Sequence, residues 1–127
     1  MEKENCKKTH QNPKKDIKKR SYDFSLSIIR LIDSMSSNSS NRILGDQLLR
    51  SATSIGANIV EAQAGSSRKD FKNFLNYALK SANETKYWLA LLRDSGKKSK
   101  LEIDPLLQES GELAKILASS IITLKSR

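Results

Sequence analysis

Apolar residues recur every three to four positions along most of this chain, which is the spacing of one face of an α-helix. The pattern predicts four amphipathic helices, at about residues 22–35, 42–64, 67–96 and 104–124. No strand pattern and no internal repeat is present. Because short connections make consecutive helices antiparallel neighbours, we expect an all-α fold, an antiparallel up-down-up-down four-helix bundle.

Loop and cap residues place the ends of these helices. The polar run at residues 36–41 is typical of a loop, and Gly65 suits a left-handed residue at the end of the second helix. Ser67 and Asp70 resemble a capping box with Asp in place of Glu. Asp104 followed by Pro105 is typical of an N-cap and first helical residue, so we expect residues 97–103 to be an exposed basic linker.

The second predicted helix carries an ordered polar row beside its apolar stripe. At 100° per residue, the row falls within about 80° on one face. Gly56 lies in the middle, where glycine costs roughly 0.5–1 kcal/mol relative to alanine. We therefore expect close helix packing at Gly56 and hydrogen bonds to the row, which we interpret as a structural polar motif: Arg50, Ser54, Asn58 and Glu61, with Gln47 beside them.

The charge of the chain is strongly positive and uneven. The 127 residues hold 23 Lys and Arg against 14 Asp and Glu, a net charge of +9, and eight of the basic residues lie in positions 1–20. This segment has almost no apolar residues, so we expect residues 1–20 to be a disordered basic arm and residues 21–127 to be one bundle domain. Such an arm can bind phosphate backbones, and a solubilising tail is the alternative.

Signals for export and membrane insertion are missing from the sequence. The N-terminal segment has no apolar core of the kind found in secretory signals, and no apolar run approaches the roughly 20 residues of a membrane span. The single cysteine, Cys6, excludes an internal disulfide. We therefore expect a cytoplasmic protein with no membrane contact.

The third predicted helix has two surfaces beyond its core stripe. An aromatic group predicts an oligomer interface, with coverage of the helix's own core by Trp88 as the alternative; it comprises Tyr77, Glu84, Tyr87, Trp88 and Leu91. The helix also presents a Lys/Asn face, which can contact phosphates and sugars or can simply be solvated; it comprises Lys69, Lys72, Asn73, Asn76, Lys80 and Asn83. The candidate nucleic-acid contacts are Arg68, Lys69, Lys72 and Lys80, together with Lys14, Lys15, Lys18, Lys19 and Arg20 of the arm.

Catalytic and metal-site patterns are weak. Cys6 and His10 supply two ligands where a closed metal site needs about four, and isolated glycines do not form a phosphate-binding loop. Glu61 and Glu84 could face each other for acid–base chemistry, but hydrogen bonds to polar neighbours are the preferred interpretation. We predict no enzymatic activity, no cofactor and no metal.

The residues from Arg50 to Gly96 resemble the four helix bundle protein family, also called 23S rRNA intervening-sequence proteins. The resemblance depends on SIGANIVEA at Ser54–Ala62 and ETKYWLALL at Glu84–Leu92. YDFSLSIIRL at Tyr22–Leu31 and LGDQLLRS at Leu44–Ser51 extend it to about residues 22–125.

The resemblance implies a small basic bundle that assembles as a ring-like homo-oligomer, a homopentamer, without catalysis. It implies a bacterial protein, since some members are encoded inside intervening sequences of bacterial 23S rRNA genes. A related branch, the accessory variability determinant proteins of diversity-generating retroelements, works with a reverse transcriptase and binds nucleic acid. We therefore expect self-association and binding of RNA or DNA by backbone charge. The alternative is a scaffold whose aromatic patch docks a protein partner such as a reverse transcriptase.

Overall fold

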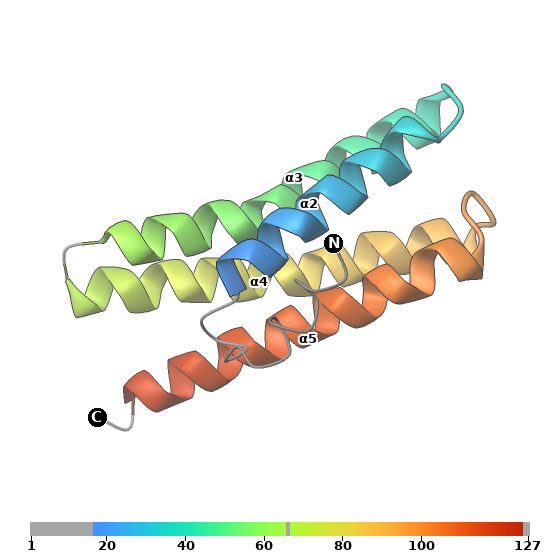
Figure 1. Ribbon diagram of the computed structural model, residues 1–127. Coiled ribbons are helices and arrows are strands. Elements are labelled where there is room, and N and C mark those ends of the chain that lie inside the picture. The colour runs from blue at the N-terminus through green and yellow to red at the C-terminus, as the bar shows by residue number, and fades with distance from the viewer. Residues whose placement is uncertain (1–16, 66, 126–127) are drawn as a thin grey trace, which may run out of the picture.

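A computed structural model describes residues 17–65 and 67–125 of the chain, and within them every regular element is a helix. The four helices are α2 (Ile17–Asp33), α3 (Ser39–Ala64), α4 (Arg68–Asp94) and α5 (Lys100–Lys125), shown in Figure 1. The predicted all-α class and the number of helices are thus confirmed for this part of the chain. None of these helices is both long and apolar enough to cross a membrane. Lys14, Lys15, Cys6 and His10 lie outside the described residues.

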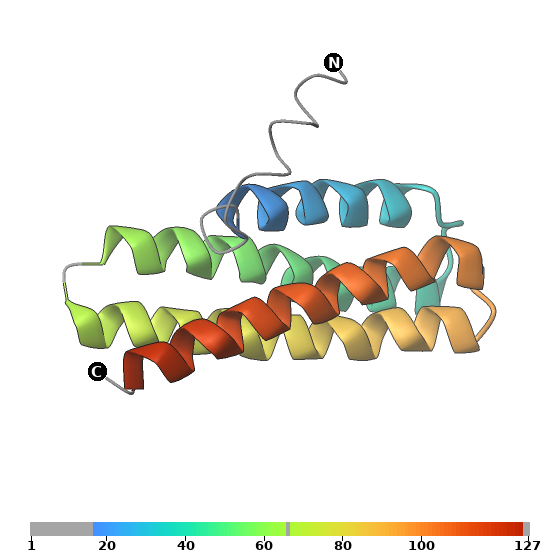
Figure 2. The same cartoon turned by 60° about the horizontal axis from the view of Figure 1, so that its bottom comes forward.

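The helices pack in a closed cycle. Each helix contacts the next along the chain, and α5 returns to contact α2, whereas the diagonal pairs do not approach closely. The seam between α2 and α3 therefore lies opposite the seam between α4 and α5. Figure 2 shows that α2 covers only part of the length of α3. With 17 residues against 26 in α3, α2 as described is about 14 Å shorter at 1.5 Å per residue.

The core is built from the apolar stripes that the sequence predicts. Ile28, Leu48, Ile59, Leu89 and Leu117 are at most 1% exposed, so all four helices contribute to it. Fully burying such a side chain contributes about 1.5–3 kcal/mol. Small buried residues, Ala52, Ala78 and Ala82, lie beside them and leave room for the larger side chains.

Polar contacts tie three of the four seams together. Between α3 and α4, the hydroxyl oxygens of Ser51 and Thr85 lie 3.0 Å apart in the interior. Between α4 and α5, the buried Ser110 Oγ donates to the Ala82 carbonyl at 2.9 Å. Between α5 and α2, the Arg20 guanidinium binds carboxylates of α5. Because a buried polar group is costly without its partner, these contacts favour one register of each helix pair.

Residues 17–20 belong to α2, although their composition predicts that they are part of the basic arm. Ile17 is only 7% exposed and lies one helical turn before the buried Ser21, with Phe24 one turn further on. Packing of Ile17 stabilises this first turn despite the run of basic residues around it. The bundle therefore includes residues from Ile17 onward rather than from residue 21.

Helix α5 begins at Lys100, so the expected linker at residues 97–103 is wrong. Ser99 Oγ accepts a hydrogen bond from the Glu102 amide at 3.2 Å, and Glu102 Oε1 accepts one from the Ser99 amide at 3.3 Å. These reciprocal bonds form a capping box. Ile103 is fully buried, Asp104 is not the N-cap, and Pro105 lies inside the helix.

The other helix ends follow the sequence more closely. Ser67 caps α4, since its Oγ accepts from the Asp70 amide at 3.0 Å, and this confirms the serine half of the predicted box. Asn38 caps α3 in the same way. The expectation of a left-handed Gly65 is wrong, because its φ is −65°. The left-handed glycine is Gly96, with φ of 80°, just after α4.

Candidate nucleic-acid interface

The first turns of α4 gather three cations around a hollow. Arg68, Lys69 and Lys72 line it together with Leu124 of α5, and its volume is about 410 Å³. None of the three cations is in an ion pair with a described residue. The N-terminal end of a helix also carries a partial positive charge, which adds to theirs. Asp70 lies in the same turn and offsets part of this charge.

Lys80 lies further along the same outward face of α4. It is eight residues beyond Lys72, which is about 12 Å along the helix axis. Lys80 is exposed and lies three residues after Tyr77 and four before Glu84. It therefore belongs to the aromatic region of α4 rather than to the hollow at the helix end.

The basic residues of α2 form a second, separate surface. Lys18 and Lys19 are exposed at the start of α2, on the seam opposite the α4–α5 hollow, and Lys19 Nζ lies 3.0 Å from Asp23 Oδ2. The sequence-predicted contacts are thus divided between two sides of the bundle. One rigid duplex cannot lie against both sides of a single protomer.

Arg20 is occupied by structural contacts. Its Nε and Nη2 donate to Glu109 Oε2 and Oε1 at 3.0 and 2.6 Å, and Nη2 also donates to Glu112 Oε1 at 2.8 Å. The hydrogen bonds that Arg20 donates to Glu109 raise the pKa of Arg20 above its usual range, and the one that it donates to Glu112 lowers the pKa of that carboxyl. Arg20 therefore ties α2 to α5 and, among the predicted contacts that lie in the described residues, is the least available to a phosphate.

The aromatic group on α4 is partly a surface and partly a cover for the core. Trp88 packs against the core while its Nε1 donates to Glu84 Oε2 at 2.9 Å. The Tyr87 ring meets Trp88 edge to face with centroids 5.0 Å apart, and Tyr87 is 59% exposed. Leu91 is half-buried one turn beyond Tyr87, and Tyr77 is exposed. Lys80 lies between Tyr77 and Glu84 of this group, whereas Trp88 is sixteen residues, about 24 Å along the helix axis, beyond Lys72.

The polar row of α3 has two kinds of member. Ser81 of α4 donates to Ser54 Oγ at 2.9 Å, and Asn58 Nδ2 donates to the same oxygen at 2.9 Å. Arg50 and Glu61 instead lie exposed at the two ends of the row. The middle of the row thus joins α3 to α4, as the structural interpretation expects, and its ends face solvent.

Glu61 and Glu84 do not face each other. Ser54 and Ser81 are opposite one another, Glu61 lies seven residues beyond Ser54, and Glu84 lies three beyond Ser81 in the antiparallel helix. The two carboxylates are therefore about 15 Å apart along the bundle. Both are exposed, so the paired-carboxylate alternative is wrong. Within the described residues, no three His, Cys, Asp or Glu side chains gather as a metal site.

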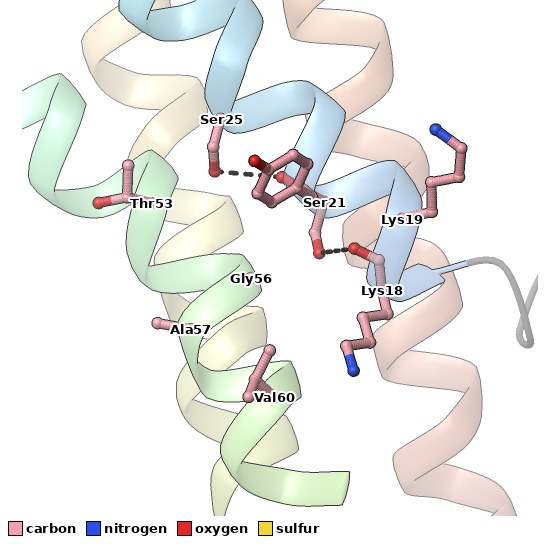
Figure 3. A pocket seen from close by; sticks show the side chains of 9 residues that line it. Lys18, Lys19, Ser21, Ser25, Thr53, Gly56, Ala57 and Val60 are labelled. Atoms are coloured by element: carbon pink, nitrogen blue, oxygen red, sulfur yellow. Dashed lines mark hydrogen bonds between the residues drawn. The ribbon is translucent and has the colours of Figure 1, made fainter.

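A groove between α2 and α3 is not predicted by the sequence pattern. Its volume is about 660 Å³ and Figure 3 shows its walls. The lining residues combine small, hydroxyl and basic side chains with one exposed ring: Lys18, Lys19, Ser21, Tyr22, Ser25, Thr53, Gly56, Ala57 and Val60. The available signal was the pair Gly56–Ala57, which leaves no large side chain on that stretch of α3.

Comparison with known proteins identifies the family. Residues 14–119 match the sequence model described as 23S rRNA-intervening sequence protein. A crystal structure from Bacteroides thetaiotaomicron, described as a protein with unknown function from the S23 ribosomal protein family, is 41% identical, with a TM-score of 0.78. The match covers 83% of this chain and 97% of that one. Among curated proteins, the comparison found no match. The chain belongs to the family of 23S rRNA-intervening sequence proteins.

Proposed function

We propose that this protein is a non-catalytic homo-oligomer that binds RNA or DNA through the phosphate backbone. The observation that carries the proposal is the hollow at the start of α4, where Arg68, Lys69 and Lys72 converge without an ion-pair partner among the described residues. Cations in such an arrangement attract a polyanion and release its counterions on binding. The net charge of +9 supports the same interpretation.

Self-association strengthens this proposal. An assembly of several copies repeats the cationic hollow, and the summed field raises the affinity for a long polyanion. The exposed Tyr77 and Tyr87, next to Trp88, are the surface we assign to contact between copies, as a homopentamer by family resemblance. A contact centred on Tyr87 and Trp88 lies more than about 20 Å along the helix axis from Lys72, which leaves the hollow open to a polyanion.

The test is a titration of labelled single-stranded and duplex RNA at several salt concentrations. The affinity of the wild-type protein should fall steeply between about 50 and 200 mM salt. The triple variant Arg68→Gln/Lys69→Gln/Lys72→Gln should bind more weakly. The slope of log affinity against log salt concentration should be less steep in this variant. The slope should change by about 0.7 for each lost contact to a single strand and by about 0.9 for each lost contact to a duplex.

A charge-matched control separates this hollow from general positive charge. Arg30→Gln/Arg42→Gln/Lys100→Gln also removes three charges, from exposed residues near the opposite end of the bundle. The control should bind more tightly than the hollow variant. Equal weakening in both variants, or no RNA binding by the wild type at low salt, contradicts the proposal.

A second candidate is a docking module for another protein, favoured by the exposed Tyr87 ring on Trp88. In this alternative the aromatic group binds a nucleic-acid enzyme instead of another copy. The variant Tyr87→Lys leaves the core intact and adds charge to the surface. If Tyr87→Lys lowers the native mass while Ile43→Lys, another exposed site, does not, then self-association is supported. A wild type that is monomeric in solution supports the docking module.

A further inference from the structure

We propose that the groove between α2 and α3 receives an unpaired nucleobase, which stacks on Tyr22 while Lys18 and Lys19 contact the adjoining phosphates. This inference rests on the proposed function and specifies single-stranded nucleic acid as the ligand of this side of the bundle. The triple variant described above acts at the α4–α5 seam. The groove is therefore a second site with its own test.

The shape of the groove comes from the small residues of α3. A Cβ atom added at Gly56 would lie 3.2 Å from Ser21 Oγ, so the two helices touch at this point and form the floor. Ala57 and Val60 continue α3 beyond the contact, with short side chains that leave the space open (Figure 3). The result is a hollow of about 660 Å³ with mainly apolar walls.

Tyr22 supplies an aromatic surface at this hollow. Its side chain is 65% exposed, although it lines the groove. An exposed ring beside an apolar hollow is the arrangement that single-strand binders use to stack bases, and every base has a face that suits it. A duplex keeps its bases stacked inside and cannot use this ring in the same way.

Hydroxyl groups on the groove walls already donate their protons to backbone carbonyls of their own helices. Ser25 Oγ donates to the Ser21 carbonyl at 3.1 Å and Thr53 Oγ1 to the Leu49 carbonyl at 2.7 Å, whereas the Ser21 hydroxyl is buried against Gly56 and faces no ligand. Each hydroxyl has one proton and two lone pairs. With the protons engaged, the oxygens remain as acceptors, which suits the N–H groups at the edge of a base.

The positive charge at the groove also favours a nucleic acid as its ligand. Lys18 and Lys19 line the groove; Lys19 is paired with Asp23 at 3.0 Å, and Lys18 has no ion-pair partner among the described residues. A phosphate next to the bound base meets these two cations. A second copy of this chain carries the same positive excess, and a symmetric contact would bring the same lysines together. The observations therefore favour a nucleic acid over a second copy.

The experiment compares a labelled oligouridylate with an abasic oligomer of the same length and backbone at low salt. The wild type should bind the oligouridylate more tightly. Tyr22→Ala should weaken oligouridylate binding about fivefold or more and leave binding of the abasic oligomer unchanged, since stacking is lost and charge is retained. Ala57→Met, which fills the groove from the α3 side, should have the same effect. Tyr22→Phe should bind like the wild type.

Ile43→Ala is the matched control, because Ile43 is 61% exposed on α3 and does not line the groove. It should bind both oligomers like the wild type, and circular dichroism should show that all variants are folded. Wild-type affinity in both Tyr22→Ala and Ala57→Met overturns the inference while the proposed function stands. A change of native mass in these two variants also overturns it, because the groove is then a contact between copies. No binding of either oligomer by the wild type overturns both proposals.

Discussion

Gly56 of α3 lies directly against Ser21 of α2. A Cβ atom at Gly56 would meet Ser21 Oγ at 3.2 Å and Ser21 Cβ at 3.5 Å. This confirms the close contact that a glycine inside a long helix predicts. The contact brings α2 onto α3 at the point where the α2–α3 groove begins.

Gly56→Leu should destabilise the protein by about 1–3 kcal/mol, because a large side chain at a closed seam forces the helices apart. The melting temperature should then fall by at least about 4 °C for a domain of this size. Gly111→Ala is the control. A Cβ at Gly111 has no neighbour within 4 Å, so this variant should gain about 0.5–1 kcal/mol from helix propensity alone. An unchanged melting temperature for Gly56→Leu contradicts the packing argument.

Removal of the Arg20 side chain should loosen the α2–α5 seam. Arg20→Met deletes the bidentate bonds to Glu109 and leaves Glu109 and Glu112 as like charges one turn apart. The expected loss at neutral pH is about 1 kcal/mol, since the pair is only partly buried. Thermal unfolding at neutral pH measures this loss. If Arg20→Met has the melting temperature of the wild type, the ion pairs of Arg20 do not stabilise the seam.

The ion pair between Arg20 and Glu112 also predicts that the stability of the protein depends on pH. The hydrogen bond from Arg20 lowers the pKa of Glu112 below its ordinary value of 4.5. A carboxyl whose native pKa is lowered adds stability above the unfolded pKa and loses it as the pH falls through the native one. The stability difference between wild type and Arg20→Met should therefore be constant above about pH 5 and shrink below the ordinary pKa. A difference that grows in acid contradicts the assignment.

The Ser51–Thr85 contact should show coupling across the α3–α4 seam. Thr85→Val should cost about 1 kcal/mol, because it removes a buried hydroxyl that also donates to the Ser81 carbonyl at 2.7 Å. Ser51→Ala should cost about the same or less. In denaturant unfolding, the double variant should lose less than the sum of the two single losses. Strict additivity would show that the two hydroxyls act independently.

The start of α5 gives a direct comparison of two candidate caps. Ser99→Ala should destabilise the protein by about 1 kcal/mol, the usual loss for an N-cap. Asp104→Ala removes only a half-exposed ion pair with Arg93, N to O distance 3.4 Å, and should cost about 0–1 kcal/mol. If Asp104→Ala lowers the free energy of unfolding more than Ser99→Ala does, Asp104 rather than Ser99 is the N-cap of α5.

The helix starts show where sequence reasoning failed and why. The basic residues around Ile17 give no sign that α2 begins there. Burial of Ile17 stabilises this first turn, and it depends on helices that are distant in sequence. At α5, the local preference of Asp104–Pro105 competed with the capping box of Ser99 and Glu102. Burial of Ile103 resolves that competition, and burial is a property of the packed bundle.

The candidate sites were predictable only in part. The Lys/Asn face and the aromatic group of α4 were visible because both follow the period of a single helix. The groove at Tyr22 was missed, since its walls come from two helices. Arg20 was placed among free cations because its partners, Glu109 and Glu112, lie about ninety positions away.

The periodic apolar pattern alone determined the helical class, the four helices and most core positions, because the 3.6-residue period is a local property that burial of one stripe requires. Only the tertiary structure decided which residues oppose each other across a seam: Gly56 with Ser21, Ser51 with Thr85, and Arg20 with Glu109. The physical reason is that an apolar stripe can slide against its neighbour at little cost. Hydrogen bonds and close contacts act over a few ångströms and hold only in one register.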